Sequence, residues 1–155
     1  MTNYPKTKLA GAFNLLSAIL NLIAGAVIAY LLFLGDFKIV PDGTEGYDNL
    51  AMIVIIPMTL IHLAVYIVSF LTHLFRGLRL KAAANSGEIS LASYIVTLMF
   101  KIIFLIANAL AIYIYFDVKV GGMVAIIATS VASVFLLITM IFEFATKNEI
   151  LDDYE

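Results

Sequence analysis

The stretch that decides the fold runs from Leu91 to Phe116 and reads LASYIVTLMFKIIFLIANALAIYIYF. Lys101 is its one charged residue, and the rest is apolar enough to cross a hydrocarbon core, which takes about 20 mostly apolar residues. The same composition recurs at 9–34, 50–75 and 123–145. Backbone in lipid must satisfy its hydrogen bonds internally, and these stretches lack the alternation of barrel strands. Each stretch therefore predicts a membrane-spanning helix.

The whole chain has the composition of a membrane protein. Its 155 residues are 63% hydrophobic and 13% charged, whereas soluble domains are about half apolar and a quarter charged. With 9 Lys and Arg against 11 Asp and Glu and no cysteine, a disordered chain, a nucleic-acid-binding surface and a disulfide scaffold are excluded. The first span is too long for a signal peptide. We predict one all-α domain over residues 1–155, an integral membrane four-helix bundle with antiparallel neighbouring spans.

Basic residues gather on one side of this topology. Six of the 9 lie in the N-terminal segment, the connection between the second and third spans, and the tail: Lys6, Lys8, Arg76, Arg79, Lys81 and Lys147. The other two connections hold only Lys38 and Lys119. By the positive-inside rule, we expect both termini to be cytoplasmic, in the cell membrane. Aromatic residues near the outer ends of the first and third spans predict an interface belt, namely Tyr30, Phe33, Phe37, Tyr113, Tyr115 and Phe116.

Small and polar residues share one face of each span when the helices are drawn at about 100° per residue. On the first span they are Gly11, Asn14, Ser17, Ala18, Asn21, Ala24, Gly25 and Ala29, and on the second Met58, His62, Tyr66, Ser69, His73 and Arg76. On the third they are Ser90, Tyr94, Thr97, Lys101, Asn108 and Tyr115, and on the fourth Ala125, Thr129, Ala132, Thr139 and Glu143. Small residues let helices approach and polar ones bond across them, so these faces predict a polar interior inside an apolar coat.

Lys101 is the most informative single residue, because an ionised side chain so far inside a span is costly unless it is paired. Glu143 lies near the inner end of the fourth span, within reach of a lysine that extends toward the cytoplasm, and we expect the two to meet. Three interpretations remain open for Lys101: a static ion pair that fixes helix register, part of a proton or ion route, or snorkelling without a fixed partner.

His62 lies near the midpoint of the second span and has two interpretations. It is either a proton carrier or a neutral ring bonded to an Asn or Thr of a neighbouring helix. His73, near the inner interface, is expected to contact headgroups or a loop. Pro57 predicts a kink one turn before His62.

No catalytic constellation occurs in the sequence, so we expect no enzyme activity, catalytic residue, metal or cofactor. The two histidines lie on one helix about 16 Å apart and cannot ligate one haem together. We expect a small multi-pass protein that self-associates or serves as an accessory subunit of a membrane assembly, with the bilayer and other membrane chains as partners and no nucleic acid. The alternative is a small proton- or ion-coupled transporter or channel with a polar route past His62, Tyr66, Lys101, Asn108 and Glu143. A partial repeat of 22–33 in 105–116 leaves a duplication open.

Overall fold

Four helices account for nearly all of the described chain. The computed structural model describes residues 4–34, 45–86, 91–116, 118 and 121–151. Helix α1 is Pro5–Phe33, α2 is Glu45–Ser86, α3 is Leu91–Tyr115 and α4 is Gly122–Leu151. Each contains a segment long and apolar enough to cross a membrane. The chain is therefore a small multi-pass membrane protein.

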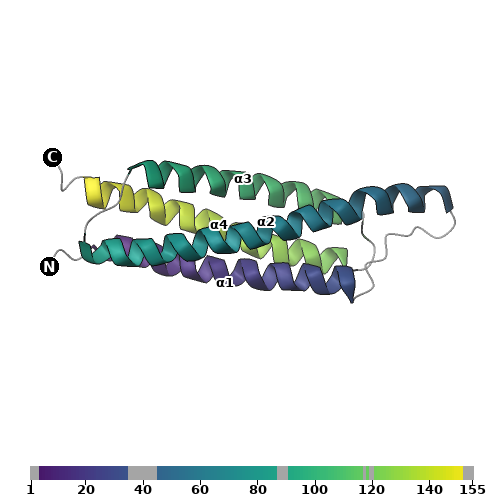
Figure 1. The fold of residues 1–155 in the computed structure, drawn as a ribbon, viewed down its shortest axis with the longest axis horizontal. Helices are drawn as coiled ribbons and strands as arrows, with labels where there is room; N and C mark the ends of the chain where they lie inside the picture. The colour runs from purple at the N-terminus through teal and green to yellow at the C-terminus, as the bar shows by residue number, and fades with distance from the viewer. Residues whose placement is uncertain (1–3, 35–44, 87–90, 117, 119–120, 152–155) are drawn as a thin grey trace.

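The helices lie side by side in one bundle. Helix α1 packs on α2 and α4, and α3 packs on the same two, whereas the backbones of α1 and α3, and those of α2 and α4, do not approach each other closely in the described residues. Figure 1 shows both termini at one end of the bundle, which we call the termini end, and α2 extending past the other helices at the opposite, loop end. The predicted all-α bundle with antiparallel neighbouring spans is confirmed. Lys38 and Lys119 lie outside the described residues.

Local sequence explains several helix boundaries. Helix α1 begins at Pro5, whose fixed φ suits a first helical position. Helix α2 continues through Pro57, whose side chain faces outward, to end at Ser86. The turn into α4 uses two glycines: Gly121 has a φ of 80°, and Gly122 lies against the carbonyl of Tyr115, where a side chain has no room.

The buried positions of every helix follow alternating steps of three and four residues. In α1 this stripe is Thr7, Ala10, Asn14, Ser17, Asn21, Ala24 and Ile28, with Gly11 and Ala18 buried beside it, and in α2 it is Ile55, Thr59, His62, Tyr66, Ser69, His73, Arg76, Leu80 and Ala83, with Gly77 and Ala84 buried beside it. In α3 they are Tyr94, Thr97, Lys101, Phe104, Asn108, Ala111 and Tyr115, and in α4 they are Gly122, Ala125, Thr129, Ala132, Leu136, Thr139, Glu143 and Thr146. This is the heptad spacing, which averages about 3.5 residues and keeps one stripe facing the bundle axis.

The heptad spacing corrects one expected position. Met58 was expected on the inward face of α2, but it is 45% exposed, and Thr59 is buried in its place. Steps of three and then four residues back from His62 reach Thr59 and Ile55, so the stripe passes Met58 by. The expected small face of α1 does point inward: Gly11, Ala18 and Ala24 are buried, and Gly25 is half-buried.

Helices α1 and α2 approach each other closely at two glycines, Gly11 and Gly77. A Cβ on Gly77 would lie 2.7 Å from Leu15 Cγ and 3.0 Å from the carbonyl oxygen of Gly11. A Cβ on Gly11 would in turn lie 3.1 Å from the carbonyl oxygen of Gly77. The small face of α1 is therefore used within the chain, against α2, as close helix packing in membranes demands.

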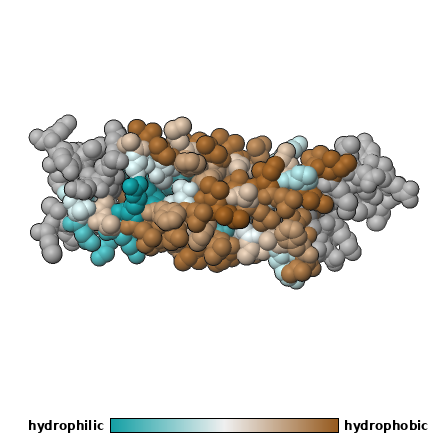
Figure 2. Space-filling model, viewed as in Figure 1, coloured by the Kyte–Doolittle hydropathy of each residue, from teal (hydrophilic) through white to brown (hydrophobic). Residues whose placement is uncertain are grey.

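Large apolar side chains cover the outside of the bundle. Figure 2 shows hydrophobic residues over its middle and hydrophilic residues gathered toward the termini end. Of the expected aromatic belt, four residues are exposed: Tyr30, Phe33, Tyr113 and Phe116. Tyr115 is 1% exposed and does not belong to the belt, because it occupies a heptad position. Phe37 lies outside the described residues.

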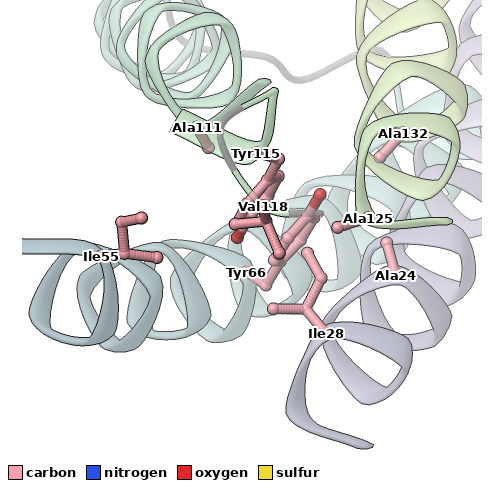
Figure 3. Close-up of a cluster of buried hydrophobic side chains, with 9 residues drawn as sticks. All are labelled: Ala24, Ile28, Ile55, Tyr66, Ala111, Tyr115, Val118, Ala125 and Ala132. Carbon is pink, nitrogen blue, oxygen red and sulfur yellow. The ribbon is translucent and has the colours of Figure 1, made fainter. Parts of the chain in front are cut away.

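A buried apolar cluster fills the half of the bundle nearer the loop end. Figure 3 shows Ile28 of α1 and Val118 beside the rings of Tyr66 and Tyr115, with Ile55 of α2 set apart from them. The alanines of the same cluster come from all four helices, namely Ala24, Ala111, Ala125 and Ala132. Tyr66 and Tyr115 contribute their rings to this cluster, while their hydroxyls bond to polar side chains in the same half of the bundle.

Candidate functional site

The first polar cluster, which we call the charged centre, joins all four helices near the termini end. It consists of Asn14, Arg76, Lys101, Thr139 and Glu143, all buried. Lys101 Nζ lies 2.7 Å from Glu143 Oε1, so the expected contact between them is present. The ammonium also donates to Asn14 Oδ1 at 2.9 Å and to Thr139 Oγ1 at 3.0 Å. Each of its three hydrogens thus has an acceptor.

The hydrogen bonds that Glu143 accepts in the charged centre all end on one carboxylate oxygen, Oε1. Its Oε1 accepts from Lys101 Nζ and from Asn14 Nδ2, the latter at 3.0 Å, and Arg76 Nε lies 3.4 Å away. Arg76 Nη1 donates to Ser93 Oγ at 3.1 Å, which ties α2 to α3. Two cations therefore face one carboxylate, and the fully ionised centre carries a net positive charge.

Three buried polar atoms beside the charged centre have no hydrogen-bond partner among the described residues. They are His73 Nε2, the Tyr94 hydroxyl and Glu143 Oε2. His73 lies close enough to Lys101 and Glu143 for their charges to act on it, and Tyr94 is placed likewise toward Glu143 and Arg76. Buried polar groups are nearly always satisfied, by protein or by ordered water.

His73 is not at the interface where it was expected. It is fully buried, its Nδ1 lies 2.8 Å from the carbonyl oxygen of Ser69, and its ring lies 6.4 Å from that of Phe104. Helix α2 continues past it to Ser86, and the heptad spacing turns His73 toward the bundle axis. It is therefore an interior residue rather than a headgroup contact.

The second polar cluster, which we call the histidine centre, lies farther from the termini end and joins α2, α3 and α4. Its members are His62, Tyr66, Asn108, Tyr115, Thr129 and Ser133. His62 Nδ1 lies 2.8 Å from the Tyr115 hydroxyl, and Nε2 lies 3.1 Å from Asn108 Oδ1. His62 thus bonds an asparagine of a neighbouring helix. The Tyr66 ring is tilted by 47° to the His62 ring, with their centroids 4.5 Å apart, and its hydroxyl donates to Thr129 Oγ1 at 3.0 Å.

The hydrogen bonds of the histidine centre assign a tautomer to its ring. Ser133 Oγ donates to the carbonyl oxygen of Thr129 at 2.8 Å, so it accepts from Asn108 Nδ2 at 3.0 Å. Asn108 Oδ1 is then the acceptor that faces His62, and Nε2 of a neutral ring carries the hydrogen. Nδ1 accepts from the Tyr115 hydroxyl. Both ring nitrogens of His62, both amide atoms of Asn108 and the hydroxyl of Ser133 thus have partners, as a buried network requires.

A column of side chains on α2 connects the two centres. His62, Tyr66, Ser69, His73 and Arg76 occupy successive buried heptad positions, and Ser69 Oγ lies 3.3 Å from His73 Nδ1. At about 1.5 Å per residue the column spans about 21 Å of a hydrocarbon core that is about 30 Å thick.

Asn21 lies outside both centres. Its Nδ2 donates to the carbonyl oxygen of Ser17 at 2.7 Å, within α1. It also lines an apolar groove of about 430 Å³ between α1 and α2, whose other walls include Gly25, Ala29 and Phe70.

Glu149 makes a contact that the sequence did not predict. The carboxylate accepts from the backbone amides of Lys6 at 3.1 Å and Thr7 at 2.8 Å, and from Thr7 Oγ1 at 2.9 Å. It therefore caps the start of α1, where free amides and the helix dipole favour a negative charge. The contact joins the ends of α1 and α4.

Arg76 was predicted on the inward face of the second span, where it lies, but it was not among the candidate site residues, because its place after the span also suggests a loop cation. The signal that identifies it is the 3.5-residue repeat itself, since Arg76 lies one heptad after Ser69 and two after His62.

No protein-family model, curated protein or solved structure matches the chain.

Proposed function

We propose that this membrane protein carries protons across the bilayer through the interior of its own bundle. The observation that carries the proposal is the convergence of the polar side chains of four helices into two centres inside a single chain. Ionisable residues within a membrane span mark proton or ion pathways by default, because their burial is otherwise costly. The interior column on α2 supplies titratable groups at His62 and His73 between the centres.

The proposal gives the two centres different tasks. The histidine centre supplies a ring with hydrogen-bond partners on both nitrogens, an arrangement in which a proton can enter at one nitrogen and leave from the other. The charged centre supplies a carboxylate, Glu143, held by Lys101 and Arg76 near the termini end. The proposal assigns no covalent chemistry to the chain. The termini end is proposed to face the cytoplasm, because six basic residues belong to that side of the topology.

A flux assay on the purified full-length protein tests this proposal. Vesicles that contain a pH-sensitive dye are given a pH gradient, with potassium and valinomycin to cancel the membrane potential. We expect the wild-type protein to dissipate the gradient faster than protein-free vesicles. His62→Gln keeps a donor and an acceptor in place but cannot carry a proton at neutral pH, so the rate should fall to background.

Thr72→Val serves as the matched control on the same helix. The hydroxyl of Thr72 donates only to the carbonyl oxygen of Val68, one turn before it, away from both centres. This variant should retain the wild-type rate. A wild-type rate equal to that of empty vesicles, or an unchanged rate in folded His62→Gln, contradicts proton transport.

A second candidate function is an accessory or self-associating subunit, favoured by the apolar groove between α1 and α2. The groove places Gly25, Ala26 and Ala29 beside Ile67 and Leu71 on the lipid-facing side, and small residues of this kind admit a further helix. Cross-linking and mass spectrometry of the gently solubilised protein test it. A second polypeptide cross-linked at α1, in the absence of proton flux, would favour this function.

A further inference from the structure

We propose that the charged centre contains a water site, bounded by His73 Nε2, the Tyr94 hydroxyl and Glu143 Oε2, in which Glu143 Oε2 is the proton acceptor. The site supplies the entry point for the proton route, and in that respect the inference rests on the proposed function. Its basis is the three buried atoms that no side chain of the described residues satisfies.

The hydrogen-bonding character of these atoms identifies what they bind. His73 Nδ1 faces the carbonyl oxygen of Ser69 at 2.8 Å and must donate to it, so Nε2 of the neutral ring is an acceptor. Glu143 Oε2 is an acceptor as a carboxylate, and the Tyr94 hydroxyl can donate or accept. Two acceptors and one hydroxyl need a guest that donates two hydrogens. Water meets this need, and waters in protein interiors typically make about three such bonds.

The surrounding charges exclude the other small guests. A metal cation would face Lys101 and Arg76, which already exceed the carboxylate in charge. An anion would face the lone pairs of Glu143 Oε2 and His73 Nε2. Water is neutral, so neither the cations nor the acceptor lone pairs repel it.

The same geometry directs an added proton to one atom. From α1 the carboxylate of Glu143 faces Asn14, from α2 it faces His73 and Arg76, and from α3 it faces Lys101 and Tyr94. Glu143 Oε1 is already occupied by donors, so it has no room for another hydrogen. A proton passed to the bound water moves on to Oε2 while the water keeps two hydrogens, so atoms and charge are conserved and no cation has to reside in the site.

Thermal unfolding of the full-length protein in lipid nanodiscs gives the first test. Tyr94→Phe removes a hydroxyl, and if that hydroxyl bonds water its loss should lower the midpoint by about 2–4 °C, the shift expected from one hydrogen bond in a chain of this size. Tyr113→Phe is the matched control, because Tyr113 lies on the same helix and is 74% exposed. An unchanged or higher midpoint for Tyr94→Phe overturns the inference, since removal of a truly unpaired buried hydroxyl is neutral or favourable.

Infrared difference spectra between neutral and acid pH give the second test. We expect a protonated carboxyl band that is lost in Glu143→Gln and shifted in Tyr94→Phe, with Tyr113→Phe unchanged. A band insensitive to Tyr94→Phe refutes the site even if Glu143→Gln fails to fold. Neither measurement depends on flux, so a hydrated site in a protein that moves no protons would contradict the proposed function and leave the inference standing.

Discussion

Replacement of Lys101 with methionine tests the charged centre, because methionine has an unbranched stem like that of lysine but carries no charge. The variant loses the bonds from Nζ to Glu143 Oε1, Asn14 Oδ1 and Thr139 Oγ1, at 2.7, 2.9 and 3.0 Å. All three acceptors remain buried in the bundle. The free energy of unfolding should therefore fall.

Two estimates bracket the size of the loss. Hydrogen bonds in membrane interiors contribute about 0.6 kcal/mol each on average, which gives about 2 kcal/mol for the three. Removal of one member of a buried ion pair costs about 3–5 kcal/mol, because the other charge is left uncompensated. Arg76 Nε lies 3.4 Å from Glu143 Oε1 and keeps a cation beside the carboxylate. We therefore expect a loss near the lower estimate, about 2–3 kcal/mol.

Titration of the micelle-solubilised protein with sodium dodecyl sulfate, followed by far-ultraviolet circular dichroism, measures this free energy. Lys81→Met is the matched control, since Lys81 is exposed on α2, and it should change stability by less than about 0.5 kcal/mol. The double variant Lys101→Met with Glu143→Gln removes both charges, so its loss should be smaller than the sum of the two single losses. Equal stability of Lys101→Met and Lys81→Met would refute the buried pair.

Three further variants test other contacts. Gly77→Ala would place a Cβ 2.7 Å from Leu15 Cγ, and this overpacking should lower stability by about 1–3 kcal/mol in the same titration. Glu149→Gln removes the carboxylate from the first turn of α1 and should lower stability by about 1 kcal/mol. Hydrogen exchange should become faster only at the amides of Lys6 and Thr7, which the carboxylate caps. Faster exchange throughout α1 would contradict the cap. Tyr115→Phe removes the donor to the imidazole of the histidine centre and should lower stability by about 1 kcal/mol. Tyr113→Phe, at an exposed position, should change stability little. Equal losses of stability in the two variants would argue against the assigned network.

The helices could be predicted because membrane spanning is a local property. A run of apolar residues fixes the helix by itself, since hydrocarbon offers no partner to an open backbone. The predicted third span, 91–116, agrees with α3 to within one residue. The second span, predicted at 50–75, lies within α2, which continues through the more polar residues around Arg76 and Arg79 to Ser86. The run of apolar residues ends before Arg76, but the hydrogen bonds of the helix continue to Ser86.

The interior positions could be predicted only in part, because the angle per residue matters over many turns. Drawing the helices at about 100° per residue placed Asn14, Lys101 and Glu143 correctly. The same drawing placed Met58 inward, and reasoning from position along the span put Tyr115 and His73 at the interface. The 3.5-residue spacing of small and polar residues resolves all three cases. That spacing is present in the sequence, but it is carried by polar rather than apolar residues.

The chain by itself determined that four helices cross a membrane, that their polar and small residues line one side of each, and that Lys101 needs a partner. Only the tertiary structure decided that one oxygen of Glu143 accepts from three donors while the other has no partner among the described residues, that Arg76 joins the same centre, and that Glu149 caps α1. The physical reason is that hydrophobicity acts on each segment separately, whereas a hydrogen bond depends on the relative depth and rotation of two helices. Those quantities are set when all four helices pack together.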